Sequence, residues 1–132
     1  MISQNTKTFM VVASFMMALT IAIGAFGAHG LKPYLDDYSS EIYQKAVSYQ
    51  FYNTLGLFFI SFVSYLLPSS SKIVKSYYFI LAGTVIFSFS LYILALTKIM
   101  WLGAITPIGG TAMIIGWVLC GYTLVKDLKT ND

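Results

Sequence analysis

The stretch FMVVASFMMALTIAIGAFGAH, Phe9–His29, contains 21 residues and no Asp, Glu, Lys or Arg. A bilayer hydrocarbon core of about 30 Å is crossed by about 20 helical residues. A helix is expected because every backbone amide in lipid must be hydrogen-bonded within the chain. The stretch therefore predicts a membrane-spanning helix, and the rest of the chain is interpreted from it.

Three further apolar runs follow, so the predicted spans are residues 9–29, 50–67, 77–97 and 105–125. Only about nine residues separate the second span from the third, which makes those two helices antiparallel neighbours. We therefore predict an all-α membrane protein. Its four transmembrane helices form an antiparallel bundle, and residues 1–132 form a single domain.

The composition excludes the soluble classes of protein. The chain is 58% hydrophobic and 10% charged, whereas a soluble domain is about 25% charged, and its mean hydropathy is +0.75. The net charge of +3 is scattered, so no nucleic-acid-binding face is predicted. Cys120 is the only cysteine, which excludes an intrachain disulfide and a multi-cysteine metal site.

The first span has an alternative interpretation as a signal peptide. Lys7 supplies a weakly basic region before the apolar run, and Ala25-Phe26-Gly27 resembles a cleavage site. The run is long for a signal peptide, so a membrane-spanning helix is favoured.

The lysines predict the orientation of the chain. With four spans, both termini and the loop between the second and third spans lie on one side of the membrane. That side carries five of the eight lysines: Lys7, Lys72, Lys75, Lys126 and Lys129. The other side carries Lys32, Lys45 and Lys98 together with three acidic residues. Because lysines accumulate on the cytoplasmic side, both termini are predicted to be cytoplasmic.

The segment EIYQKAVSYQFYN, residues 41–53, predicts an amphipathic helix between the first two spans. One face carries Ile42, Ala46, Tyr49 and Asn53, and the opposite face is polar. We expect this segment to lie at the outer membrane surface, where tyrosine rings are favoured, and to lead into the second span. Docking of a partner protein is the alternative.

Small residues predict where helices approach closely. Gly24, Gly27 and Ala28 form a notch near the end of the first span, and Gly109 and Gly110 do the same in the fourth. Helix association in lipid depends on such small residues, because they let two backbones come together. The alternative is a notch that admits a ligand.

Four polar residues are predicted to lie in one layer at the outer ends of the spans: His29, Gln50, Asn53 and Thr106. Polar side chains near the hydrocarbon are costly unless paired, so this layer is the candidate site. We expect a hydrogen bond between His29 and Asn53 across the first two helices.

Four blocks of sequence, GAFGAHGLK, YQFYNTLGL, FSFSLYILALT and LGAITPIGGTAMIIGW, resemble the YgdD/YwdK-like family of small inner-membrane proteins. A mitochondrial relative of that family is called transmembrane protein 256. The resemblance covers roughly residues 8–125 and implies four membrane helices in the bacterial inner membrane. It implies no activity, because the function of the family is unknown. Asn53 stands where the family usually has a histidine, which weighs against a paired-histidine role such as haem ligation or a proton relay.

The function favoured by the sequence is a structural or assembly component of the membrane. Its partners would be lipids and either a second copy of the chain or another membrane protein. The alternative is a binder of a lipid, a quinone or another apolar small molecule at the outer-leaflet end of the bundle. A small transporter is less favoured, because no carboxylate lies within a span. We expect no enzyme, because no nucleophile–base pair or metal cluster is found; no catalytic residue, metal or cofactor is predicted.

Overall fold

The computed structural model describes residues 1–129, and these residues form only helices and short connections. In chain order the elements are α1 (Gln4–His29), η1 (Lys32–Tyr34), α2 (Asp37–Leu66), α3 (Ser71–Thr97), η2 (Met100–Ala104) and α4 (Thr106–Asp127). The predicted all-helical class is confirmed.

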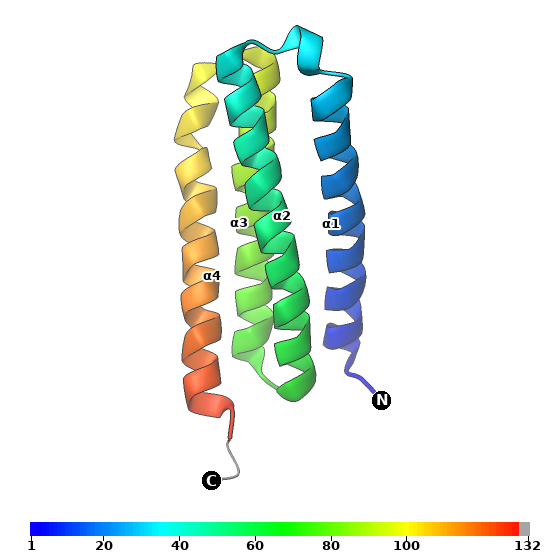
Figure 1. Cartoon of the computed structure of the whole chain (residues 1–132). Coiled ribbons are helices and arrows are strands. Elements are labelled where there is room, and N and C mark those ends of the chain that lie inside the picture. Colours follow the sequence, from blue (N-terminus) through cyan, green and yellow to red (C-terminus); the bar gives the residue numbers. More distant parts are fainter. Residues whose placement is uncertain (130–132) are drawn as a thin grey trace.

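The four long helices lie alongside one another (Figure 1). Helices α2 and α3 occupy the middle, with α1 packed on α2 and α4 packed on α3. The start of α1, the α2–α3 connection and the end of α4 lie at one end of the molecule. The connections that contain η1 and η2 lie at the other end. Here the first end is called the terminal end, and the second the loop end.

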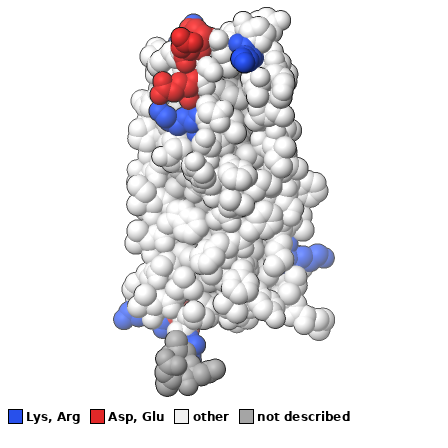
Figure 2. Space-filling model, in the orientation of Figure 1, with Lys and Arg blue, Asp and Glu red and all other residues white. Residues whose placement is uncertain are grey.

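In the part of the chain that the structure describes, three helical segments are long and apolar enough to cross a membrane: Gln4–His29, Ser71–Thr97 and Met100–Asp127. Helix α2 is not among them, because polar residues interrupt its apolar pattern. Figure 2 shows charged side chains gathered towards the two ends of the molecule, with a belt of uncharged residues between them. A belt of this kind matches the hydrocarbon layer of a bilayer.

Capping residues set where three of the helices begin. The side chains of Ser3, Asp36 and Ser70 accept hydrogen bonds from the backbone N–H groups of Thr6, Ser39 and Ile73. These bonds satisfy amides that a helix leaves unpaired in its first turn. Helices α1, α2 and α3 therefore begin before the first residue of the predicted spans.

The predicted amphipathic segment at residues 41–53 is helical and leads into the second span, as expected, but it is not a separate element. These residues belong to α2, a single helix of 30 residues and therefore about 45 Å long. Tyr43, Ala46 and Gln50 are buried within the protein. The segment is amphipathic because one face of α2 packs against neighbouring helices.

Helices α3 and α4 come together through glycines. A methyl group built on Gly109 would lie 2.5 Å from the backbone nitrogen of Phe87 and 2.7 Å from the carbonyl oxygen of Gly83. A methyl group on Gly116 would lie 3.0 Å from the backbone nitrogen of Ile80. The backbones of α3 and α4 therefore lie close together at Gly109. Gly110 has ordinary contact only, since its added methyl group would lie 3.8 Å from the Phe87 ring.

The notch predicted in α1 receives a side chain rather than a backbone. A methyl group on Gly27 would lie 2.1 Å from the Tyr43 ring, and the Tyr43 hydroxyl donates a hydrogen bond of 2.7 Å to the carbonyl of Ile23. Gly24 faces Val47, and Ala28 is exposed. The expected backbone contact is therefore wrong here, because the tyrosine ring occupies the space that the small residues leave.

We predict that Gly109→Ala destabilises the protein while Gly121→Ala does not. The added methyl at Gly109 meets backbone atoms, and overpacking of this kind costs about 1–3 kcal/mol. Gly121 lies on the same helix with nothing within 4 Å of the added methyl, so only the gain in helix propensity, up to about 1 kcal/mol, remains. Thermal unfolding in detergent measures both variants. Equal unfolding temperatures would contradict the glycine contact.

Candidate functional site

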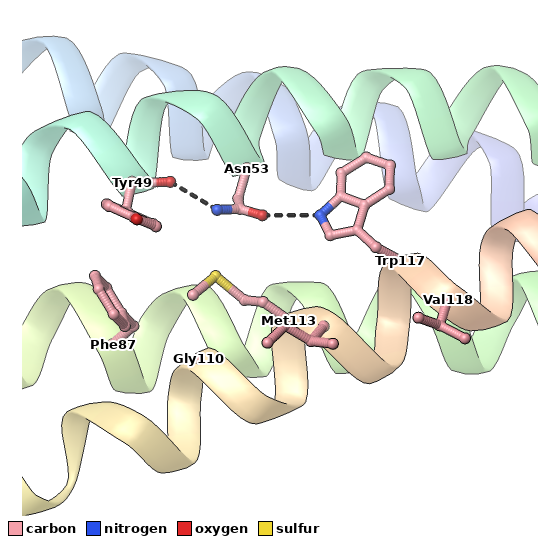
Figure 3. A pocket seen from close by; sticks show the side chains of 8 residues that line it. Tyr49, Asn53, Phe87, Gly110, Met113, Trp117 and Val118 are labelled. Atoms are coloured by element: carbon pink, nitrogen blue, oxygen red, sulfur yellow. Dashed lines mark hydrogen bonds between the residues drawn. The ribbon is translucent and has the colours of Figure 1, made fainter.

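A groove between α2 and α4, with α3 at its base, is the candidate site. Its volume is about 490 Å³, within the range of about 300–1,000 Å³ that small-molecule sites occupy. Its lining residues are Tyr49, Asn53, Phe87, Gly110, Met113, Ile114, Trp117 and Val118 (Figure 3). We call this the α2–α4 groove.

Trp117 and Asn53 form the polar link across the groove. The Trp117 indole N–H donates a hydrogen bond of 3.1 Å to Asn53 Oδ1, and Asn53 Nδ2 donates one of 3.0 Å to the carbonyl of Tyr49. The indole lies over Gly56, where an added methyl group would lie only 2.2 Å from the ring. A glycine in α2 therefore makes room for a tryptophan from α4.

The remaining walls of the groove are apolar. The Tyr49 and Phe87 rings stand 4.6 Å apart between centroids, and Met113 is buried beside them. Ile114 and Val118 are about two-thirds exposed at the rim. The groove therefore opens sideways, on the surface that belongs to the uncharged belt.

The predicted polar layer does not form one cluster. Asn53 is 7% exposed and lies in the α2–α4 groove, whereas His29 is exposed at the end of α1. The His29 ring nitrogen Nδ1 pairs with the carbonyl of Ala25 in its own helix, at 3.0 Å. The expected hydrogen bond between His29 and Asn53 is therefore wrong, because His29 bonds within α1 whereas Asn53 bonds Trp117 and the Tyr49 carbonyl.

Gln50 and Thr106 have partners of their own. Gln50 is fully buried, accepts a hydrogen bond of 2.7 Å from the Tyr92 hydroxyl, and directs Nε2 to the Met16 sulfur at 3.4 Å. The Thr106 hydroxyl lies 2.8 Å from the Ser90 hydroxyl, which joins α4 to α3. Each predicted residue except His29 thus links helices, but at a separate place.

Sequence reasoning missed the aromatic walls of the groove. Tryptophan is enriched at the two membrane interfaces, so a tryptophan near the middle of an apolar span is unusual. Trp117 stands in the middle of the predicted fourth span, and that position was the available signal. Tyr49 and Phe87 carried no comparable signal, because aromatic residues are frequent throughout the chain.

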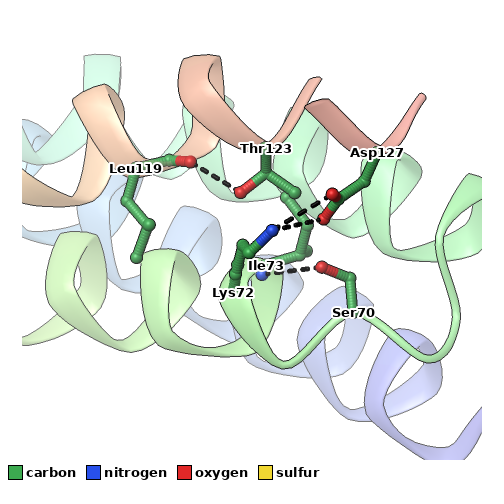
Figure 4. A network of polar contacts seen from close by, with 6 residues as sticks. All are labelled: Ser70, Lys72, Ile73, Leu119, Thr123 and Asp127. Atoms are coloured by element: carbon green, nitrogen blue, oxygen red, sulfur yellow. Dashed lines mark hydrogen bonds and ion pairs between the residues drawn. The ribbon is translucent and has the colours of Figure 1, made fainter. Parts of the chain in front are cut away.

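Ion pairs fasten the two ends of the molecule. At the terminal end, Lys72 Nζ donates to both carboxylate oxygens of Asp127, at 3.0 and 3.1 Å, which ties α3 to α4 (Figure 4). At the loop end, Lys98 pairs with Asp36. The hydrogen bond from Lys98, followed by that from the Ser39 backbone, lowers the pKa of Asp36 to about 2. Within residues 1–129, no three His, Cys, Asp or Glu side chains gather as a metal site.

We predict that Asn53 and Trp117 are energetically coupled. A hydrogen bond contributes about 0.5–1.5 kcal/mol, and removing either partner leaves the other unpaired. Asn53→Ala and Trp117→Phe should each lower the free energy of unfolding, and the double variant should cost less than their sum. Unfolding in detergent measures this double-mutant cycle.

The matched control is His29→Ala, which should change stability by less than about 0.5 kcal/mol, because the side chain is exposed. Its effect should add to that of Asn53→Ala. Additive effects for Asn53 and Trp117 would mean that the indole and the amide are not bonded.

Comparison with known proteins confirms the resemblance. A family described as a protein of unknown function, DUF423, matches residues 23–110. UPF0382 membrane protein YwdK from Bacillus subtilis is 39% identical over 122 residues, which is 92% of this chain and 99% of YwdK. UPF0382 membrane proteins from Staphylococcus haemolyticus and Staphylococcus epidermidis are 43% and 42% identical. These alignments cover 86% and 91% of this chain, and 91% and 97% of the two relatives.

No solved structure matches the chain. The alignments cover nearly the full length of these bacterial relatives, and each relative is named as a membrane protein. Their names agree with the three apolar helices and the uncharged belt. The chain therefore belongs to the DUF423 family, whose UPF0382 relatives are bacterial membrane proteins of unknown function.

Proposed function

We propose that this protein is a membrane-embedded binder of an apolar small molecule, which it holds in the α2–α4 groove without catalysis. The observation that carries the proposal is the groove itself, with its apolar walls and one amide link. Asn53 stands near the middle of α2, and Trp117 near the middle of α4. A ligand would therefore enter from the hydrocarbon layer rather than from water.

The proposal includes α2 as a fourth transmembrane helix in an antiparallel bundle. From Gln50 onward, the Asn, Gln, Ser and Thr side chains that lower the hydropathy of α2 face the inside of the protein. Its buried polar side chains are Ser39, Gln50, Asn53, Thr54, Ser61 and Ser64. The exposed side chains of residues 55–62 are large and apolar: Leu55, Phe58, Phe59 and Phe62. A helix with this distribution presents an apolar surface to lipid.

The proposal places the chain in the bacterial inner membrane with the terminal end in the cytoplasm. Five lysines belong to that end and three to the loop end, which also holds Asp36, Asp37 and Glu41. The excess of lysine supports a cytoplasmic terminal end. Residues 130–132, at the C-terminus, lie outside the described part of the chain.

A second candidate function is an assembly component, and one observation favours it. Helix α1 packs on α2 but leaves much of its surface uncovered. The uncovered side carries small residues at helical spacing: Ser14, Ala18, Ala22 and Ala25. Small residues let transmembrane helices approach closely, so a second copy of the chain or another membrane protein would fit there.

A reporter fused after Asp132 tests the orientation. A fusion partner that is active only outside the cytoplasm should be silent, because five lysines hold the terminal end inside. The same partner inserted between Asp36 and Asp37 should be active. The reverse pattern would overturn the orientation and leave the helical fold intact.

Native mass spectrometry from mild detergent tests both candidate functions. The binder proposal predicts an apolar molecule bound to the protein and lost in Gly110→Leu, because the new side chain fills the open groove. Gly121→Leu is the matched control on the same helix and should retain the molecule. A protein that carries no molecule, or loses it equally in both variants, would contradict the binder. A mass of two copies would support the assembly component.

A further inference from the structure

The walls of the α2–α4 groove contain more aromatic surface than a simple lipid chain requires. The Tyr49 and Phe87 rings lie at 36° to one another, with their centroids 4.6 Å apart. The Trp117 ring lies further along the groove, with the Phe59 ring at 6.4 Å and 28°. Flat rings gain from offset or edge contacts with other rings beyond the area that they bury. The groove is therefore suited to a ligand that carries a ring.

The groove also offers hydrogen-bond donors. The Asn53 amide has two N–H groups, and among residues 1–129 the structure gives Nδ2 one acceptor, the Tyr49 carbonyl. A donor that faces hydrocarbon has no water to bond, so an acceptor on a ligand would lower its free energy.

Among residues 1–129, no carboxylate or lysine lines the groove. A charged ligand would therefore meet no counter-ion there, and burying its charge would be costly. The ligand has to be neutral, and its polar atoms should be acceptors rather than donors. A lipid acyl chain satisfies the first condition but has neither a ring nor an acceptor at this depth.

We propose that the α2–α4 groove binds a neutral, membrane-soluble ring that carries carbonyl oxygens and an apolar tail, the chemical class of the prenylated quinones. The inference rests on the proposed function and specifies its ligand. The ring lies against Phe87 and Tyr49, and a ring carbonyl accepts a hydrogen bond from Asn53. The tail leaves past the exposed rim residues Ile114 and Val118 into the lipid. The proposal concerns binding alone and includes no redox step.

Tryptophan fluorescence can test this proposal, because one of the two tryptophans lines the groove. Trp101→Phe leaves Trp117 as the only reporter, and Trp117→Phe leaves Trp101, which is exposed in η2. Both proteins are reconstituted in phosphatidylcholine vesicles and titrated with decylubiquinone, a short-tailed benzoquinone. We expect quenching of Trp117 that saturates, and quenching of Trp101 that rises linearly through collisions alone.

Three further variants in the Trp101→Phe protein show whether the ring and the carbonyl are recognised. Asn53→Leu removes the donor, and one hydrogen bond corresponds to about two- to tenfold in the quenching midpoint. Phe87→Leu removes the ring contact without touching the Asn53–Trp117 bond and should also raise the midpoint. Phe62→Leu is the control, an exposed residue of α2 that does not line the groove, and should leave the midpoint unchanged.

Vesicles of phosphatidylcholine with brominated acyl chains distinguish failure of this inference from failure of the proposed function. Linear quenching of Trp117 by decylubiquinone, or an unchanged midpoint in both Asn53→Leu and Phe87→Leu, overturns the assignment of a carbonyl-bearing ring. If brominated chains then quench Trp117 and Gly110→Leu relieves that quenching, an acyl chain occupies the groove, and the proposed function survives. If the Gly110→Leu substitution changes the quenching of Trp117 neither by decylubiquinone nor by brominated chains, both proposals fail.

Discussion

Within the uncharged belt, polar side chains must be paired inside the protein, and this constraint governs how the helices pack. Many hydroxyl groups bond a carbonyl one turn earlier in their own helix, as those of Thr54, Ser61 and Thr84 do. Others reach the backbone of a neighbouring helix: Ser76 bonds the Gly116 carbonyl, and Tyr77 bonds that of Phe9. These bonds position the helices as well as satisfying donors, because an unpaired donor in hydrocarbon costs several kcal/mol.

The same constraint explains why α2 lies in the middle. Its buried Gln50 and Asn53 need partners from more than one helix, and Tyr92 of α3 and Trp117 of α4 supply them. Its outer surface is apolar and aromatic. Helices α1 and α4 bury fewer polar side chains than α2 and α3 do, and they lie on opposite sides of the α2–α3 pair.

The groove forms because α4 packs closely against α3 but not against α2. Glycines bring α4 close to α3 along Gly109 and Gly116, which draws α4 away from α2. The large indole of Trp117 then bridges part of the gap and is held by Asn53. The space between the Trp117 link and the Tyr49 and Phe87 rings remains open to the side. Close packing at one interface thus creates a cavity at the next.

The helical class, the membrane setting and the end of α1 at His29 could be predicted from the amino-acid sequence, because these follow from local hydropathy and residue size. The partners of the polar residues could not be predicted in this way, because they depend on how the helices pack. A sequence shows that His29 and Asn53 need hydrogen bonds, but not that Ala25 and Trp117 supply them. The rotation of each helix about its axis fixes those partners, and that rotation depends on packing between residues far apart in the chain.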